Sequence, residues 1–237
     1  MSGGRRLHWL DTLRGLCVLL MATFHFGYDL YFYCGFPAAF VASPFMVACQ
    51  VISSWGFILL SGVSSRLSES NIKRGLVVLC GGAVVSVVTW FWGDFIRFGI
   101  LQFLGCAMVL YGLTNRLWER LPRPLAPLLY LLLFFLTLRA LPRVMDLPYF
   151  YPFGFVTPDF RSADYYPIFP WFFLFLFGTW LGLYIKAGRT PRPLGMVRVR
   201  PLAFLGRHAF AAYFIHQPLL LGLSWILAWA TGHTPPF

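Results

Sequence analysis

The chain has 237 residues, of which 59% are hydrophobic and only 11% charged, and its mean hydropathy is +0.70. Soluble domains carry about 25% charged residues, so this composition excludes an ordinary soluble domain and indicates an integral membrane protein. Aromatic residues make up 19% of the chain, which excludes a disordered chain. The net charge of +11 can indicate a polyanionic partner or a membrane topology, and the positions of the charged residues distinguish the two.

Apolar segments of at least about 17 residues can cross a bilayer core about 30 Å thick, and such segments recur along the chain. The first follows Arg5 and Arg6, but Asp11 and Arg14 interrupt its start, so we interpret it as a retained anchor and not as a secretory signal. The pattern predicts an all-α, polytopic membrane helical bundle of about seven transmembrane helices, at residues 10–34, 44–64, 75–92, 98–114, 125–141, 167–186 and 203–229.

Most basic residues lie on one side of these segments. With the N-terminus inside, 15 of the 19 lysines and arginines face the cytoplasm, together with 3 of the 8 acidic residues. The positive-inside rule therefore predicts an N-in, C-out orientation. The excess positive charge is thus first a topology signal. The basic loops do not resemble a nucleic-acid groove, and they are suited to anionic lipid headgroups or to a soluble polyanion.

The longest connection between the predicted helices, residues 142–166, is rich in Pro, Tyr and Phe. Connections of this length usually carry function or are disordered. The aromatic content favours an ordered lid on the outer side.

Several kinds of site are not supported by the sequence. The five cysteines form no C-x-x-C pair, and we expect neither a disulfide framework nor a metal site. Motifs for nucleotide hydrolysis, dinucleotide binding, zinc proteases and serine hydrolases do not occur. The candidate chemistry must therefore come from polar residues within the membrane segments.

His25 and Asp29 form the first candidate site. An ionisable residue at mid-membrane depth is costly and normally faces the bundle interior, where it marks a site or a pathway. Asp29 follows His25 by one helical turn, and Tyr28 lies beside them. A carboxylate at this spacing can fix the tautomer of the imidazole and raise its basicity, as general-base catalysis requires. The alternatives are a structural histidine and an Asp29 at the headgroup level.

His216 is the second mid-depth histidine, near the middle of the last segment, with Tyr213 one turn before it and Gln217 directly after it. It either bonds a neighbouring helix or joins His25 in a functional site. Histidines at opposite ends of the sequence can meet only if the first and last helices pack together. This packing is a structural prediction.

Other polar and small residues are weaker candidates. Arg97 and Gln102 begin the fourth segment from the outside, where an arginine can extend to lipid phosphate or point at a substrate. Small residues such as Gly81 and Gly178 permit close helix contacts, either within the chain or in a homo-oligomer.

Five stretches in order span almost the whole chain: RLHWLDTLRGLCVLLMATFHFGYDL (6–30), FILLSGVSSRLSESNIKRG (57–75), DFIRFGILQFLG (94–105), ADYYPIFPWFFLFLFG (163–178) and GRHAFAAYFIHQP (206–218). Together they resemble the bacterial branch of the heparan-alpha-glucosaminide N-acetyltransferase catalytic domains. The resemblance implies a single transmembrane acyltransferase domain over residues 1–237, with acetyl-CoA as co-substrate and no metal. The acetyl group would pass from cytoplasmic acetyl-CoA to an amino sugar or hydroxyl of a glycan outside.

The resemblance also implies where the site lies. Lysosomal members of the family use a histidine further along the first external loop, where this chain reads YCGFP, and His25 stands at an asparagine position that contacts the acetyl donor. We therefore expect His25 to deprotonate the acceptor, with Asp29 orienting it and His216 assisting, or a covalent acetyl-histidine to form. The expected substrate contacts are Tyr28, Arg97, Gln102 and Gln217, and the expected contacts of the CoA phosphates are Arg66, Lys73, Arg74 and Arg207.

The small size of the chain suggests the inner (plasma) membrane of a bacterium and a cell-envelope sugar as acceptor, not heparan sulfate. Two other functions stay open. Histidines on different helices are also what axial haem ligation needs, so a haem-binding membrane protein using His25 and His216 is one alternative. A sugar or lipid transporter is the other, although we find no convincing repeat between the two halves of the sequence.

Overall fold

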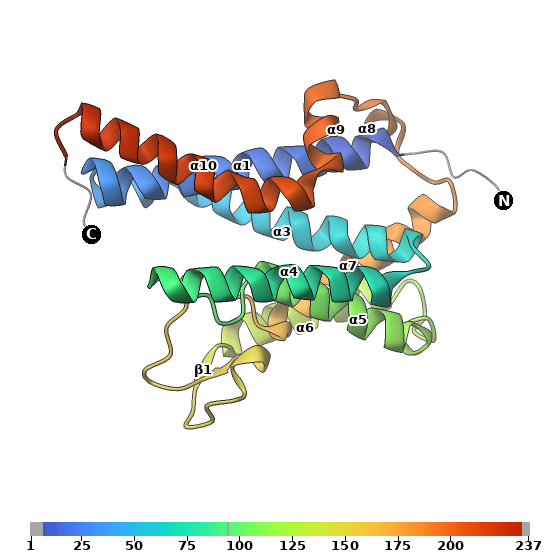
Figure 1. Cartoon of the computed structure of the whole chain (residues 1–237). Helices are drawn as coiled ribbons and strands as arrows, with labels where there is room; N and C mark the ends of the chain where they lie inside the picture. The colour runs from blue at the N-terminus through green and yellow to red at the C-terminus, as the bar shows by residue number, and fades with distance from the viewer. Residues whose placement is uncertain (1–6, 94, 234–237) are drawn as a thin grey trace. The chain divides into compact units, whose positions relative to one another are not determined.

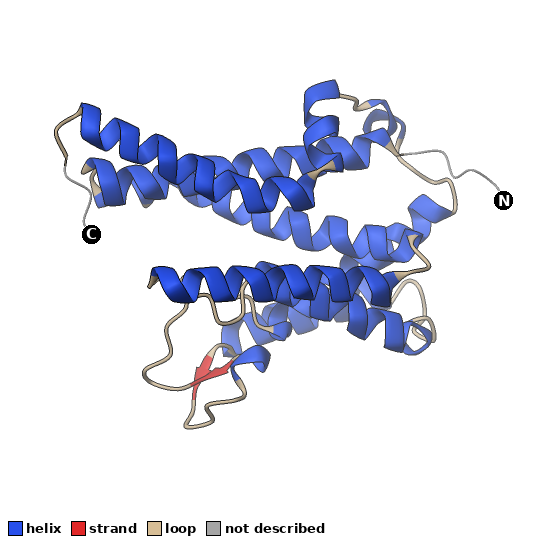
Figure 2. Cartoon of the chain, in the orientation of Figure 1, coloured by secondary structure: helices blue, strands red, loops and turns tan. Residues whose placement is uncertain are grey.

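The computed structural model describes residues 7–93 and 95–233, so Arg5 and Arg6 of the predicted anchor lie outside the described residues. Nearly all regular structure in the described part of the chain is helical (Figures 1 and 2). The elements are α1 (His8–Cys34), α2 (Ala38–Val41), α3 (Pro44–Leu67), α4 (Asn71–Trp92), α5 (Ile100–Trp118), α6 (Ala126–Ala140), β1 (Arg143–Val144), η1 (Tyr151–Phe153), β2 (Phe155–Val156), α7 (Ile168–Lys186), α8 (Arg192–Met196), α9 (Arg200–Arg207) and α10 (Ala209–Ala230).

The predicted membrane segments coincide with helices. Six helices, α1, α3, α4, α5, α7 and α10, are long and apolar enough to cross a membrane, and α6 is apolar but has only 15 residues. The prediction of an all-α polytopic membrane bundle is confirmed. The last predicted segment differs in one respect, because the backbone leaves the helical region at His208 (φ −106°, ψ 21°) and separates α9 from α10.

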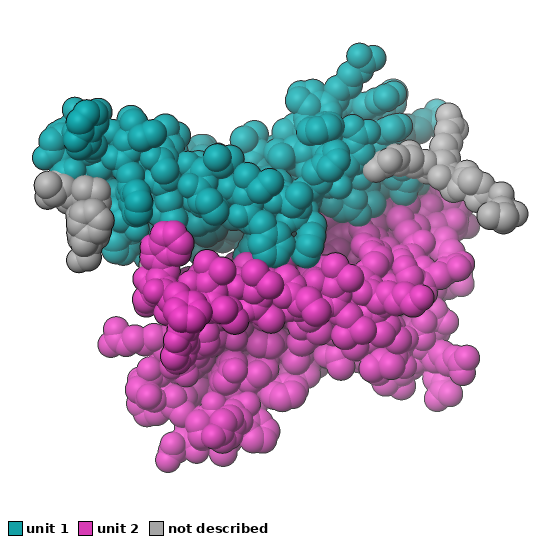
Figure 3. Space-filling model, in the orientation of Figure 1, with its two compact units in different colours: residues 1–57, 190–237 teal, residues 58–189 magenta. Residues whose placement is uncertain are grey.

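The chain divides into two compact units (Figure 3), residues 1–57 with 190–237 and residues 58–189, which we call unit 1 and unit 2. In unit 1, α1 packs against α2, α8, α9 and α10. Helices α1 and α9 touch through their backbones at two glycines. A Cβ on Gly15 would collide with the carbonyl oxygen of Leu202, and one on Gly206 with that of Asp11. Glycine is therefore required at this crossing.

In unit 2, α4 packs against α5, and α7 packs against α5 and α6. Its core is aromatic, with Phe103, Phe134 and Phe175 each at most 1% exposed. The end of α3 that belongs to unit 2 crosses α7 at Gly62 and Gly178, where an added Cβ would again meet backbone atoms. Aromatic rings thus fill the core of unit 2, and glycines allow the close approach of its helices.

The connection between α6 and α7 is ordered by hydrogen bonds, as expected from its composition. Strand β1 pairs in parallel with β2, and an isolated parallel bridge joins Phe98 to Tyr165. The Asp164 carboxylate accepts a hydrogen bond from the backbone N–H of Ile100 (2.8 Å) at the start of α5. The chain segment before α7 is therefore fixed to the segment before α5.

Candidate active site

His25 on α1 and His216 on α10 lie side by side within unit 1. Their ring centroids are 5.2 Å apart with an interplanar angle of 58°. The prediction that the first and last helices pack together is therefore confirmed. Two imidazoles in direct contact, on helices from opposite ends of the sequence, form a polar centre among largely apolar neighbours.

The hydrogen bonds of His216 define its tautomer. Nδ1 lies 2.6 Å from the backbone carbonyl oxygen of Tyr213, which can only accept, so Nδ1 carries the proton. In the neutral ring Nε2 therefore carries the lone pair, and this atom is buried without a hydrogen-bond partner among the described residues. A buried, unpartnered acceptor of this kind is poised to receive a proton from a bound molecule.

Asp29 is 4% exposed, and its partner in the structure is Gln217, not His25. The Gln217 side-chain NH₂ donates to both carboxylate oxygens, at 3.1 and 3.3 Å. The described hydrogen bonds include none between Asp29 and His25, so the expected orienting contact is replaced by one across the helix pair.

The side-chain amide of Gln217 is thereby held through its NH₂ group, while its Oε1 makes no hydrogen bond in the described part of the chain. Because its NH₂ group is held by Asp29, its Oε1 faces the opposite way and is buried without a partner in the described part of the chain. Tyr28, expected beside the site, is 45% exposed and contacts the rings of Phe24, Tyr31 and Phe32. The candidate centre in unit 1 thus offers two unpartnered acceptors on neighbouring residues, His216 Nε2 and Gln217 Oε1.

The separation of the two rings bears on haem ligation. A centroid distance of 5.2 Å lies in the range of rings in direct contact, so a porphyrin does not fit between His25 and His216 as they stand. Among residues 7–93 and 95–233, no group of three or more His, Cys, Asp or Glu side chains is placed to hold a metal ion.

Arg97 and Gln102 belong to unit 2, whereas the histidine pair belongs to unit 1. Gln102 is 9% exposed and fully engaged: its Oε1 accepts from the Gly99 N–H (3.0 Å), and its NH₂ donates to the Gly82 carbonyl (2.8 Å). It therefore caps α5 and joins it to α4. The Arg97 guanidinium lies over the rings of Phe95 and Phe160, at 5.7 and 5.5 Å from their centroids.

A second candidate site is a cavity of about 620 Å³ in unit 2, where α3 ends and α4 begins. It contains two of the predicted CoA-binding residues, Arg66 and Lys73. Its further lining residues are Ser65, Ser68, Glu69, Ser70, Asn71, Ile72, Tyr111, Gly112, Asn115, Glu119 and Lys186. Three side chains bring positive charge to it, and sequence reasoning missed the third, Lys186.

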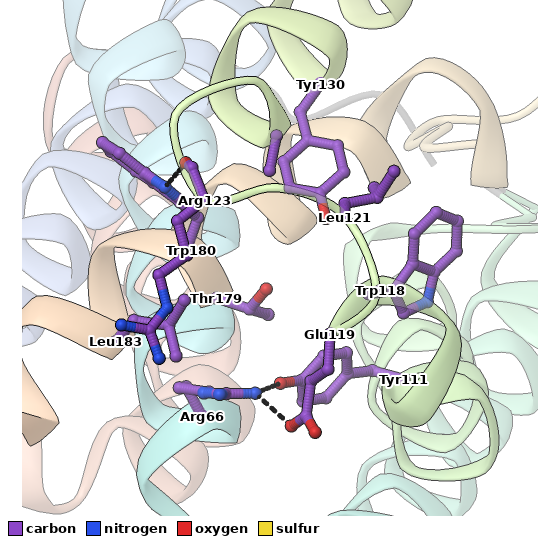
Figure 4. A pocket seen from close by; sticks show the side chains of 11 residues that line it. Arg66, Tyr111, Trp118, Glu119, Leu121, Arg123, Tyr130, Thr179, Trp180 and Leu183 are labelled. Carbon is purple, nitrogen blue, oxygen red and sulfur yellow. Dashed lines mark hydrogen bonds and ion pairs between the residues drawn. The ribbon is translucent and has the colours of Figure 1, made fainter.

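Arg66 is the central side chain of this cavity. One of its terminal nitrogens donates to the Tyr111 hydroxyl (3.1 Å) and to the Glu119 carboxylate (2.6 Å), so that the three side chains converge (Figure 4). They also line a smaller cavity of about 200 Å³, with Arg123 and two tryptophans, Trp118 and Trp180, in its wall (Figure 4). A guanidinium whose other nitrogens stay available, beside aromatic side chains, suits an anionic ligand.

Buried polar atoms without partners concentrate at this cavity. Arg66 Nε, Ser65 Oγ and Asn71 Oδ1 have none among the described residues. The Asn71 NH₂ is held by the Ser65 carbonyl (2.8 Å), which directs its oxygen elsewhere. No motif distinguishes Ser65 or Asn71 in the sequence, because their significance depends on burial.

The remaining two predicted CoA contacts are not part of this cavity. Arg74 follows Lys73 but does not line it. Arg207 belongs to unit 1, where its guanidinium lies 5.6 Å from the ring of Phe204.

These features define the class of the protein, a multi-pass integral membrane protein of all-α architecture with polar centres among its apolar helices. The chain belongs to the family described as heparan-alpha-glucosaminide N-acetyltransferase, catalytic, which its residues 6–218 match. Membership indicates a membrane acyltransferase, and the match includes every predicted site residue. Searches of curated proteins and of solved structures gave no significant match.

Proposed function

We propose that the protein transfers an acetyl group from acetyl-CoA to an amino or hydroxyl group of a sugar, and that the two histidines form the reacting centre. The observation that carries the proposal is the His25–His216 contact with its unpartnered Nε2, in a chain of this acyltransferase family. We further propose one domain over residues 1–237, an N-in, C-out orientation in a bacterial plasma membrane, and a cell-envelope glycan as acceptor.

In the proposed reaction His216 takes the role of base that the sequence had favoured for His25. Its Nε2 accepts the proton of the acceptor N–H or O–H as the acceptor attacks the thioester carbonyl. A C–N or C–O bond forms, the C–S bond breaks, and the proton passes to the departing thiolate to give CoA–SH. His25, in ring contact with His216, polarises the carbonyl oxygen or relays the proton.

Gln217 and Asp29 are proposed to position the acceptor. The Asp29 carboxylate holds the Gln217 NH₂ group, which presents Oε1 as an acceptor for a second O–H or N–H of the sugar. Recognition of a polar substrate through buried, otherwise unpaired groups discriminates strongly against analogues that lack the matching hydrogen. Asp29 is accordingly a positioning residue, not a base.

The cavity of unit 2 is proposed to bind the phosphates of CoA. Arg66, Lys73 and Lys186 supply positive charge, and Ser65 and Asn71 supply unpartnered polar atoms. Glu119, whose side chain is 50% exposed, forms an ion pair with Arg66, and a phosphate bound to Arg66 would displace it. Glu119→Gln should therefore lower the KM for acetyl-CoA, because it removes a competing carboxylate from Arg66.

Acetyl transfer in proteoliposomes tests the proposal, with labelled acetyl-CoA and a panel of amino sugars and their hydroxyl analogues. We expect His216→Ala and His25→Ala to lose activity by roughly 100-fold or more, as for loss of a general base. His208→Ala is the matched control, because the side-chain contacts described for this exposed histidine are with the carbonyl and the ring of Phe204, one turn earlier. Near-normal turnover in both site variants would refute the assignment of the site.

A single-turnover experiment separates the two possible routes. If an acetyl-histidine forms, purified protein without acceptor releases one equivalent of CoA–SH from acetyl-CoA. If transfer is direct, CoA–SH appears only after the acceptor is added. In either case a colourless preparation that binds acetyl-CoA argues against the haem alternative.

A further inference from the structure

Helix α6 is too short to cross a membrane. Its 15 residues extend about 22 Å at a rise of about 1.5 Å per residue, which is about 8 Å less than a hydrocarbon core of about 30 Å. The six longer apolar helices have 19 to 27 residues. The exposed face of α6 is nevertheless purely apolar over its middle turns, at Leu128, Leu132, Phe135 and Leu136. The chain directly after Ala140 is in the position to supply the missing apolar surface.

The segment that follows, residues 141–156, carries such a surface. Tyr149 is 85% exposed, and Val144, Phe150 and Phe153 are 63%, 50% and 42% exposed. In an aqueous loop these side chains would leave a large apolar area in water, which a soluble surface rarely tolerates. The segment begins directly after the exposed apolar residues of α6 end.

Much of the backbone of this segment is hydrogen-bonded internally. The N–H groups of residues 143, 145, 147, 150, 153, 154 and 155 all donate to carbonyl oxygens within the segment. In lipid, an unpaired N–H costs several kcal/mol, so irregular backbone at membrane depth needs internal partners. The pairing of β1 with β2 and the turns around η1 provide many of these partners, but the hydrogen bonds described include none from the N–H groups of Asp146, Tyr149 and Tyr151. This backbone therefore suits the interface, where headgroups and water reach it, and only its side chains suit the acyl region.

The position of the segment along α4 agrees with a location at the membrane interface. In the view of Figure 2, the β1–η1–β2 element lies at the level of the last turns of α4, not beyond the end of that helix. Those turns carry Trp90, Phe91 and Trp92, which are 63%, 84% and 61% exposed. Exposed tryptophans at a helix end are typical of the aromatic belt at the membrane interface.

The charged residues near the segment fit an interfacial location. Arg139, Arg143 and Asp146 are all exposed. Long arginine side chains at this level extend to the phosphates while their stems stay in the apolar region. Interfacial elements combine such a charged side with aromatic residues that enter the acyl boundary by about 5–10 Å, which matches the missing length of α6.

We propose that residues 141–156 form a membrane-embedded interfacial element, in which Tyr149, Phe150 and Phe153 insert among lipid acyl chains and complete the span begun by α6. The occupant of this surface is the lipid of the leaflet at the C-terminal end of α6. The connection between α6 and α7 is thus not, as a whole, a lid exposed to water on both sides. Only its second part, residues 157–167, borders the aqueous phase. This inference is independent of the proposed enzyme activity.

Depth-dependent quenching of a fluorophore tests the proposal in the full-length protein in vesicles. Single cysteines replace Tyr149, Phe153 or, as the control in the same connection, Asp159, in a Cys80→Ser, Cys106→Ala background, because the other three thiols are buried. We expect lipids brominated near the top of the acyl chain to quench labels at 149 and 153. Iodide should quench these two labels several-fold less than the label at 159.

Each other outcome overturns the proposal. Strong iodide quenching at 149 and 153 without quenching by brominated lipid would place the segment in water. If neither quencher reaches the labels at a high protein-to-lipid ratio, but both do at a low ratio, a second copy of the chain covers this surface. Thermal melting of each labelled protein in detergent establishes that it is folded, and Tyr149 is exposed enough to be replaced without loss of packing.

Discussion

Asp164 links the connection before α7 to the start of α5, and its neutralisation should stabilise the protein above pH 6. Its carboxylate accepts hydrogen bonds from the backbone N–H groups of Ile100 and Tyr165, which lower its pKa. Burial acts in the opposite direction and more strongly, so the pKa rises from 3.8 to about 6. The folded protein therefore holds a proton that the unfolded chain releases between these two pH values.

The sign and size of the effect follow from linkage. Because the folded-state pKa is the higher one, stability falls as pH rises from about 4 to about 6 and is constant above that. A difference of about two pKa units corresponds to about 3 kcal/mol at 1.36 kcal/mol per unit. The N-terminus of α5 favours a carboxylate by up to about 1 kcal/mol, which leaves about 2 kcal/mol.

Asp164→Asn keeps an oxygen for the Ile100 N–H but cannot ionise. Thermal melting in detergent should show the variant about 2 kcal/mol more stable than the wild type at pH 7.5 and nearly equal at pH 4. Hydrogen exchange at residues 95–100 and 162–166 reports the same difference locally.

Asp159→Asn is the control of opposite sign. A hydrogen bond with the Thr157 side chain lowers the pKa of this exposed carboxylate, so its small contribution to stability is present at neutral pH and is lost on acidification. If Asp164→Asn is instead less stable than the wild type at pH 7.5, the hydrogen bonds of the carboxylate outweigh its burial and the reasoning fails.

Three further predictions concern packing, the polar pair and the donor cavity. Gly15→Ala places a methyl group on a backbone carbonyl of α9 and should cost about 1–3 kcal/mol in thermal melts, whereas Gly222→Ala, in open space, should be neutral or better. Gln217→Leu leaves the buried Asp29 carboxylate without its donor and should cost about 1–3 kcal/mol, partly restored by adding Asp29→Asn; a variant as stable as the wild type would contradict this. Arg66→Lys should raise the KM for acetyl-CoA roughly tenfold without changing the KM for the acceptor, and an equal rise in both would exclude a donor-specific role.

Much of the architecture followed from local properties of the sequence. Length and hydropathy were sufficient to locate the membrane helices, because each must satisfy its backbone hydrogen bonds within itself whatever its neighbours are. The break at His208 was not predicted, since the apolar pattern runs on from α9 into α10. The shortness of α6 between two prolines was visible in the sequence, but its consequence for the segment that follows required the exposure of individual side chains.

The sequence by itself determined that this is a polytopic membrane protein and that His25, Asp29 and His216 are the rare ionisable groups at depth, because hydropathy and residue type are local quantities. Only the tertiary structure decided how they pair. It brought His25 to His216 across 190 residues, gave Asp29 to Gln217, and left His216 Nε2 without a partner. Contacts between helices depend on which faces pack, and that choice is made by glycines and side-chain shape along the whole interface.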